Sequence, residues 1–117
     1  MLIRYALTPA TVTRIIDGDT IELSTGERVR FIGVDTPERG EPGADEATAF
    51  VTDRIINQLV WLEPDGNNTD VYGRLRRYVW IRYPSDTSDS SQIQSYMLNA
   101  LLLSNGLADV SSIFLYL

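Results

Sequence analysis

The sequence predicts a mainly β domain of the α+β class, a five-stranded Greek-key barrel of the OB type with two packed helices. Three observations support this prediction. Short runs rich in β-branched residues alternate with turn residues at the start of the chain, an amphipathic helical segment follows the third run, and two further strand-like runs precede a second helical segment. A plain α+β sandwich fits the same order of elements, because barrel closure cannot be inferred from one sequence.

The first third of the chain is expected to form a β-meander. Thr11 to Ile16 alternates and is rich in β-branched residues, and an Asp-Gly-Asp turn separates it from the returning strand Thr20 to Leu23. After a second, glycine-containing turn, Arg28 to Val34 is expected to be the third strand. Pro37 cannot continue that strand, because proline has no amide hydrogen to donate.

From Asp45 onward the spacing of apolar residues changes to four, which predicts an amphipathic helix of about three to four turns. Its apolar row is Ala47, Val51, Ile55 and Leu59.

Two further strands and a second helix are expected after it. Val60 to Leu62 is a short strand-like run, and Tyr78 to Tyr83 is rich in β-forming residues.

The second helix contains Ile93, Met97 and Leu101, with capping-box spacing between Ser91 and Gln94. Gly106 is its expected left-handed stop. The segment from Leu107 to the end, with its apolar run Ile113 to Leu117, is expected to be partly strand.

Composition indicates one domain and excludes several kinds of chemistry. The 117-residue chain is 44% hydrophobic and 22% charged, which is ordinary for a globular domain. It has no cysteine and no histidine, and its ten basic residues are all arginine, so thiolate or imidazole metal ligands and lysine Schiff bases are excluded. A net charge of −6 argues against broad electrostatic binding to nucleic acid, although a local positive cleft fits this balance.

No run approaches the ~20 apolar residues of a membrane span, so no membrane association is expected. Met1 to Ala10 is interrupted by Arg4 and is too short for a signal peptide. The location therefore stays open between the cytoplasm and the outside of the cell after removal of a leader. We expect residues 1–9 to be an N-terminal extension and residues 10–117 to be a single domain; the oligomeric state stays open.

Charged side chains collect where the third strand gives way to a loop. Arg30 lies on the strand, and Asp35 and Glu38 follow it. If the strands pair as a meander, Asp19 in the first turn can converge with Asp35. Two carboxylates with backbone carbonyls and water are what Ca²⁺ or Mg²⁺ needs. The alternative is that Asp19 serves only a hairpin turn and Asp35 only the end of a strand.

Three more residues have both a chemical and a structural interpretation. Glu38 could orient or deprotonate a water near a bound ion, or be a solvated loop residue. Arg74 could join Arg30 in stabilising charge on a phosphoryl group, or be an ordinary surface arginine. Tyr72 could stack on a base or sit in the core. The residues thus permit metal-assisted phosphodiester chemistry without histidine or cysteine.

Four motifs, in this order, resemble the staphylococcal nuclease (thermonuclease-like) family. They are Ile16-Asp-Gly-Asp-Thr20, Arg30-Phe-Ile-Gly-Val-Asp-Thr-Pro-Glu38, Glu46-Ala-Thr-Ala-Phe50 and Thr69-Asp-Val-Tyr-Gly-Arg74. The resemblance extends from Ala10 to Val110. It implies an OB-type barrel and calcium-dependent hydrolysis of single-stranded DNA or RNA.

The resemblance also implies roles for individual residues. Asp19, Asp35 and the Thr36 carbonyl would be calcium ligands, and Glu38 would activate or orient the attacking water.

On the substrate side, Arg30 and Arg74 would hold the phosphate, and Tyr72 would contact the nucleotide. The implied reaction cleaves the phosphodiester on its 5′-oxygen side and leaves 3′-phosphate ends.

The chain departs from the family pattern at several points. Val71 stands where the family's best-known member has a lysine, the Arg39 to Ala44 loop is shorter than in that member, and the family's later C-terminal helix has no counterpart before Leu117. The lost lysine, the missing helix and the acidic net charge favour an alternative, a catalytically weak or inactive nuclease-like OB module that binds nucleic acid or a protein partner. A third reading is an unrelated OB-type domain that binds oligosaccharide or protein.

Overall fold

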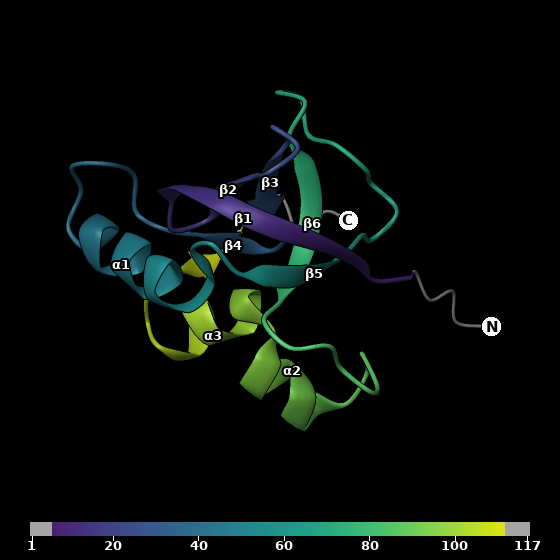
Figure 1. The fold of residues 1–117 in the computed structure, drawn as a ribbon. Coiled ribbons are helices and arrows are strands. Elements are labelled where there is room, and N and C mark those ends of the chain that lie inside the picture. Colours follow the sequence, from purple (N-terminus) through teal and green to yellow (C-terminus); the bar gives the residue numbers. More distant parts are fainter. Residues whose placement is uncertain (1–5, 112–117) are drawn as a thin grey trace.

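A closed five-stranded barrel forms the centre of the molecule in a computed structural model that describes residues 6–111 (Figure 1). Strands β1 (Thr8–Asp17), β2 (Thr20–Leu23) and β3 (Arg28–Phe31) pair as an antiparallel meander. β3 then pairs in parallel with β6 (Leu75–Trp80), and β5 (Leu59–Glu63) closes the barrel between β6 and β1. The predicted OB-type barrel is confirmed, and the sandwich alternative is wrong.

The third predicted strand is divided by a turn. It was expected to continue to Val34, but β3 ends at Phe31 and a separate strand, β4 (Val34–Asp35), follows. Gly33 in the turn has φ 79°, a backbone conformation that favours glycine. β4 pairs with β7 (Asp109–Val110) outside the barrel. The chain therefore leaves the barrel just before it reaches the residues expected to form the site.

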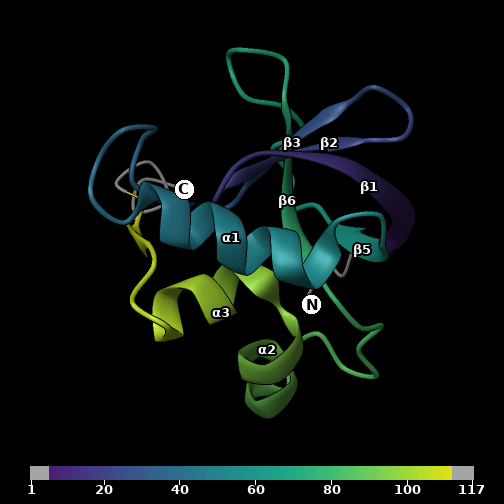
Figure 2. The same cartoon turned by 60° about the vertical axis from the view of Figure 1, so that its left-hand side comes forward.

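Helix α1 (Ala44–Ile55) confirms the predicted amphipathic helix and packs against β1 along the outside of the barrel (Figure 2). Its buried residues are Ala44, Ala47, Val51 and Ile55. Leu59 is not the next residue of this row: it begins β5 and is half-exposed. No helix among residues 6–111 is long and apolar enough to cross a bilayer.

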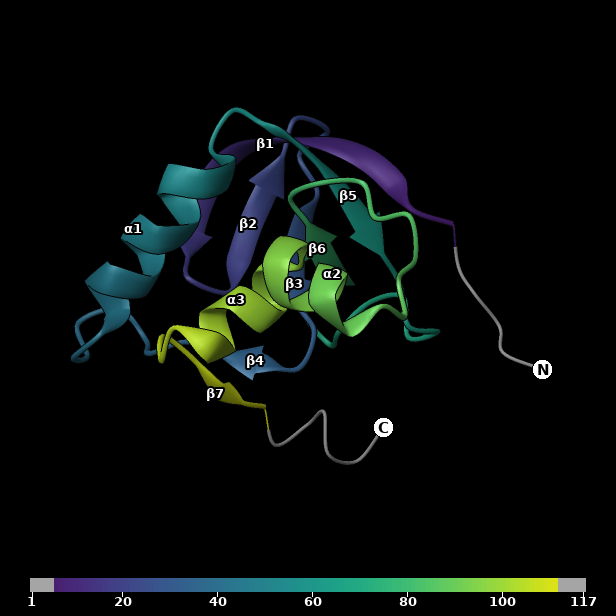
Figure 3. The same ribbon diagram turned by 90° about the horizontal axis from the view of Figure 1, so that it is seen from below.

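The second predicted helix is in fact two short helices, α2 (Ser90–Tyr96) and α3 (Leu98–Ser104). Met97 interrupts them with extended backbone angles (φ −92°, ψ 116°), because it forms an isolated bridge with Trp80 at the end of β6. α3 packs against β6, and Figure 3 shows both helices from below, in front of the barrel. The local helical pattern was correct, but the pairing with Trp80 breaks it.

Of the two predicted ends of this helical region, the start is wrong and the stop is confirmed. Asp89 is the N-cap of α2, and its side chain accepts hydrogen bonds from the amides of Ser91 and Gln92. The predicted Ser91 capping box is therefore wrong. Gly106, with φ 69°, has the left-handed conformation expected at the helix stop.

Three predicted strand boundaries also differ from those in the structure. β1 starts at Thr8 rather than Thr11, because its first residues pair with β5. β6 starts at Leu75, since Leu75 to Arg77 pair with β3, and it ends at Trp80 rather than Tyr83. The strand expected within Ile113 to Leu117 lies outside the described residues.

The core lies inside the barrel and beneath α1 and α3. Its buried apolar side chains are Val12, Ile21, Leu23, Val29, Phe31, Val34, Val51, Ile55, Val60, Leu62, Val79, Leu98 and Leu102. One buried polar side chain, Asn99 of α3, connects this helix to β6 and to the turn after β3. Its Oδ1 accepts from the Val79 amide (2.8 Å) and its Nδ2 donates to the Ile32 carbonyl (2.9 Å). Asn99 thereby fixes the turn after β3, which carries the chain toward the site.

Replacing Asn99 with alanine should lower the free energy of unfolding by about 3 kcal/mol, because the buried Val79 amide and Ile32 carbonyl lose their side-chain partner. Chemical denaturation measures this change. Asn105→Ala is the matched control: its amide bonds only the Leu101 carbonyl at an exposed position, and the expected change is within about 0.5 kcal/mol. Equal effects of the two substitutions would contradict the connecting role of Asn99.

Candidate active site

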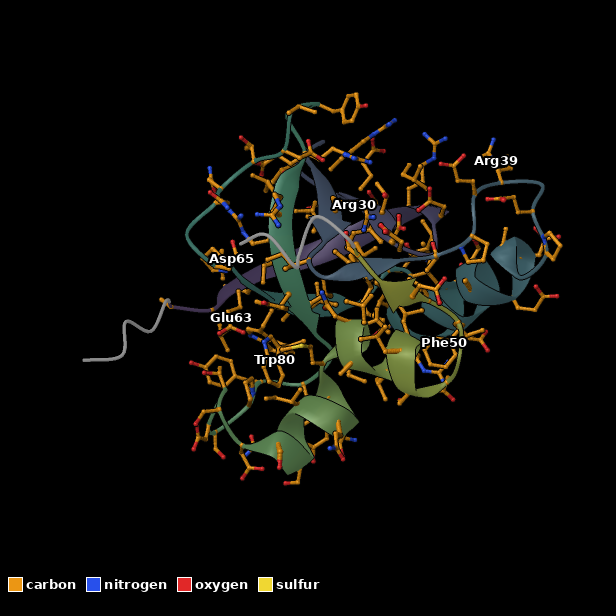
Figure 4. All side chains as sticks on the ribbon, turned by 180° about the vertical axis from the view of Figure 1, so that it is seen from behind. Arg30, Arg39, Phe50, Glu63, Asp65 and Trp80 are labelled. Carbon is orange, nitrogen blue, oxygen red and sulfur yellow. The ribbon has the colours of Figure 1, made fainter. Side chains whose placement is uncertain are left out.

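A polar cavity of about 660 Å³ lies where the β1–β2 turn, β3, β4 and the loops before α1 and β6 meet. Its lining residues are Asp17, Asp19, Arg30, Asp35, Thr36, Pro37, Glu38, Glu41 and Arg74. Six of the seven residues predicted from the sequence thus share one cavity. Tyr72 is the exception. Figure 4 shows Arg30 in the middle of this charged region.

The turn between β1 and β2 holds Asp19 in a fixed, buried position. The Thr20 hydroxyl donates to Asp19 Oδ1 (3.0 Å), and the Thr36 amide donates to Asp19 Oδ2 (3.0 Å). Gly18 allows this close approach, because a Cβ there would lie 2.7–2.9 Å from side-chain atoms of Ala47 and Thr36. The turn therefore packs directly on the segment that follows β4, as the meander prediction required.

Asp17 is a second carboxylate beside Asp19. Burial, and then its closeness to Asp19, raise the pKa of Asp17 from 3.8 to about 6. For Asp19, burial alone would raise the pKa, but the hydrogen bond with Asp17, the positive charge of Arg30 and the Thr36 amide together lower it. Two adjacent carboxylates in this cavity thus resist carrying two negative charges at once.

Arg30 is the positive group that joins Asp19 and Asp35, the two carboxylates among the three predicted metal ligands. Its Nη2 lies 3.4 Å from Asp19 Oδ2 and also forms an ion pair with Asp35 Oδ1. Its Nη1 donates to the carbonyls of Phe31 (2.9 Å) and Val34 (2.7 Å), on either side of the turn between β3 and β4. The guanidinium therefore anchors the end of β3, β4 and the β1–β2 turn at one point.

Arg74 is held by an aspartate that the sequence analysis did not single out. Asp70 Oδ2 accepts from Arg74 Nε at 2.6 Å, and Asp70 Oδ1 accepts from the amides of Tyr72 (2.9 Å) and Arg74 (3.0 Å). Burial tends to raise the pKa of Asp70, but these hydrogen bonds and the charge of Arg74 lower it overall. The loop before β6 thus presents Arg74 in a defined orientation.

Tyr72 lies beside the carboxylate cavity, in a neighbouring one of about 410 Å³ that shares Arg30 and Arg74 with it. The tyrosine is 79% exposed, so the core interpretation is wrong. The Arg74 guanidinium lies 5.2 Å from the ring centroid, a cation–π contact. Val71, which precedes it, is 92% exposed and contributes no charge.

Glu38 is exposed, lines the carboxylate cavity, and has no hydrogen-bond or ion-pair partner for its carboxylate within residues 6–111. Three further acidic residues, Asp17, Glu41 and Asp70, belong to the site but were not predicted. The spacing of Asp70 and Arg74, four residues apart around a glycine turn, was an available signal. Asp17 had been assigned only to the turn, and an exposed loop glutamate such as Glu41 carries no distinguishing sequence signal.

The donor atoms present suit a hard divalent cation. Asp19, Asp35 and Thr36 all line the cavity, and oxygen atoms are the ligands that such a cation prefers. The Thr36 hydroxyl is buried and has no hydrogen-bond partner among the described residues. Among the residues that the structure describes, no three acidic side chains are arranged so that together they could hold a metal ion. Asp19 and Asp35 both form ion pairs with Arg30.

The barrel and its cavity of carboxylates and arginines agree with the comparison to known families. Residues 28–115, most of the chain, match the family of staphylococcal nuclease homologues. The chain belongs to this family.

Several curated proteins are similar to the chain. A thermonuclease of Staphylococcus intermedius is 44% identical over 79 residues, which cover 60% of this chain and 47% of the relative. A thermonuclease of Staphylococcus hyicus is 42% identical over the same shares of the two chains. The endonuclease YncB of Bacillus subtilis is 31% identical over 118 residues, which cover 92% of this chain and 50% of the relative. The chain therefore spans about half the length of these relatives.

The carboxylate pair predicts a specific pH dependence in metal-free solution. Because the folded-state pKa of Asp17 lies above 3.8, the folded state favours the protonated form, and its stability should decrease as pH rises from about 4 through about 6. We expect a loss of about 1–2 kcal/mol, reduced from the full linkage value because the group is partly solvated. The pKa of Asp19 is lowered, so the stability that this group contributes to the fold is lost only as the pH falls below about 4.

Asp17→Asn should remove this decrease, since asparagine is uncharged and retains the Oδ1 that accepts from the Asp19 amide. Asp53→Asn, on the exposed side of α1, is the control that should keep it. Denaturation curves between pH 4 and 7 in chelator measure both. A decrease in Asp17→Asn as large as that of the unmodified protein would show that Asp17 is not its source.

Proposed function

We propose that this chain is a metal-dependent nuclease that hydrolyses phosphodiester bonds in DNA or RNA. The observation that carries the proposal is the shared cavity, in which Arg30 and Arg74 lie with the carboxylates of Asp19, Asp35 and Glu38. Arginine binds phosphate oxygens in a bidentate manner, and a cavity that combines arginines with carboxylates suits phosphoryl transfer. The relatives named thermonuclease and endonuclease support the same reaction class.

Calcium is the ion we propose, with Asp19, Asp35 and the Thr36 carbonyl as its protein ligands. The all-oxygen donor set fits a hard cation. A positive ion would also offset the repulsion between the carboxylates of Asp17 and Asp19, which adds to burial in raising the pKa of Asp17. When bound, such an ion would supply Lewis-acid stabilisation of charge on the phosphate oxygens.

The remaining steps belong to the chain's own side chains. Glu38 would accept a proton from the attacking water, or orient it, because its carboxylate faces the cavity and is not engaged elsewhere among the described residues. The guanidinium of Arg74, held through Nε by Asp70, keeps its Nη groups for non-bridging phosphate oxygens. Rupture of the phosphorus–5′-oxygen bond would leave a 3′-phosphate and a 5′-hydroxyl.

Tyr72 supports a single-stranded substrate. Its exposed ring lies at the neighbouring cavity, which is lined by the same two arginines as the carboxylate cavity. A base stacked on the ring would therefore belong to the nucleotide whose phosphate the arginines hold. Stacking on an aromatic side chain requires an unpaired base, and it tolerates any sequence.

A binding module that does not cut remains the second candidate. The specific observations in its favour are the exposed Val71, which adds no positive charge beside the arginines, and the net charge of −6. Both reduce attraction to a polyanion.

Cleavage of a fluorescently quenched single-stranded DNA in Ca²⁺ distinguishes the two candidates. Glu38→Gln and Arg74→Ala should each lower kcat by at least about 100-fold, because one removes the proton acceptor and the other a phosphate donor. Glu46→Gln on α1 and Arg82→Ala beyond β6 make the same charge changes away from both cavities and should leave kcat unchanged. Cleavage at the wild-type rate by both site variants would contradict the mechanism; nucleic-acid binding without cleavage would favour the module.

Thermal unfolding tests the ion separately from the reaction. Calcium at 100 times its dissociation constant should stabilise the chain by about 2.7 kcal/mol, and chelator should reverse the gain. Asp19→Asn should lose this response, whereas Asp53→Asn should retain it. A calcium-induced shift of the same size in Asp19→Asn would place the ion elsewhere.

A further inference from the structure

We propose that Glu41 is a positioning residue for Glu38, an inference that rests on the proposed nuclease function. The two glutamates are joined by a reciprocal pair of hydrogen bonds. The Glu38 amide donates to the Glu41 carboxylate oxygen Oε1 (2.9 Å), and the Glu41 amide donates to the Glu38 carbonyl (2.9 Å). Glu41 therefore holds both backbone polar groups of the residue whose carboxylate lines the cavity.

The loop that carries Glu38 consists of two consecutive turns joined at Glu41. Gly40 is the third residue of the first turn and has φ 90°. A turn with a positive φ at this position favours glycine there. In the second, Pro42 and Gly43 (φ 91°) follow Glu41, whose carbonyl accepts from the Ala44 amide (3.1 Å). Ala44 is the first residue of α1 and is buried.

Glu41 thus connects Glu38 to a rigid element. A single turn hydrogen bond in an exposed loop leaves the turn free to open, whereas the carboxylate of Glu41 closes it a second time. The connection runs from the Glu38 amide through Glu41 to the start of α1, which packs on the barrel. The position of the Glu38 carboxylate is consequently set by a side chain and not only by backbone.

The negative charge of Glu41 does not explain why a glutamate lies at this cavity. Glu41 lines a cavity that already contains Asp17, Asp19, Asp35 and Glu38, where another negative charge is unfavourable for binding a phosphate. Its hydrogen bond to the Glu38 amide gives the carboxylate a specific partner. The feature that matters is therefore the acceptor oxygen, which glutamine also has.

Two substitutions separate the acceptor from the charge. With single-stranded DNA and Ca²⁺, Glu41→Ala should lower kcat by about 10- to 100-fold with KM nearly unchanged, because displacing a catalytic group by a small distance costs rates of this order. Glu41→Gln, which keeps Oε1, should stay within about threefold of the unmodified protein. Asp53→Ala, an exposed residue of α1 outside the cavity, controls for the loss of one negative charge.

Amide hydrogen exchange and a double variant test the positioning role of Glu41 independently of the kcat of the single variants. Exchange of the Glu38 amide should accelerate in Glu41→Ala but not in Glu41→Gln, while the unfolding temperature stays close to that of the unmodified protein. In a Glu38→Gln background, Glu41→Ala should cause no further loss of kcat, because residues that act as a unit are not additive.

Three results would overturn the role of Glu41. They are a kcat in Glu41→Ala equal to that of the unmodified protein, an equal loss in Glu41→Gln, or a further tenfold loss in the Glu38→Gln background. Absence of cleavage by the unmodified protein is a different result. It would reject the proposed function itself and with it any positioning role, whatever the exchange of the Glu38 amide shows.

Discussion

The ion pairs of Arg30 with Asp19 and Asp35 are the interaction on which the site depends. The carboxylates that gather at the cavity repel one another, and the ion pairs of Arg30 offset part of this repulsion. Burial, and then the closeness of Asp19, raise the pKa of Asp17. Arg30 also bonds the carbonyls on both sides of the turn between β3 and β4. One guanidinium therefore offsets the charge of the carboxylates and also holds the backbone of the turn. We infer that a divalent cation would bind the same two carboxylates and that a phosphate would bind the guanidinium.

The other functional groups sit on loops, and acidic side chains hold those loops by bonding backbone amides. Asp70 organises the turn that presents Arg74, and Glu41 organises the turn that presents Glu38. Asp89 does the same at the start of α2, away from the site. These three carboxylates are among the 16 acidic residues of a chain of net charge −6, and they support structure in addition to carrying charge. An acidic composition is therefore compatible with a cavity in which two arginines, Arg30 and Arg74, are held in place by carboxylates.

Sequence reasoning recovered the barrel and most of the cavity because short-range signals encode them. Alternating strands, the spacing of α1, and the four ordered motifs each depend on neighbouring residues. The break at Gly33 and the split at Met97 were missed, because they arise from pairing of β4 with β7 and of Met97 with Trp80, partners distant in sequence. Glu41 was missed for a different reason: its hydrogen bond with the nearby Glu38 amide depends on a turn geometry that the residue types of an exposed loop do not reveal.

The measurement that tests the central claim most directly is an analysis of reaction ends. A 5′-labelled single-stranded oligonucleotide would be incubated with the chain in Ca²⁺ or in chelator, and its fragments identified by mass spectrometry. We predict fragments with 3′-phosphate and 5′-hydroxyl ends in Ca²⁺ and intact oligonucleotide in chelator. Fragments with 3′-hydroxyl ends, or equal cleavage in chelator, would contradict the account of a calcium-assisted attack supported by Arg30, Glu38 and Arg74.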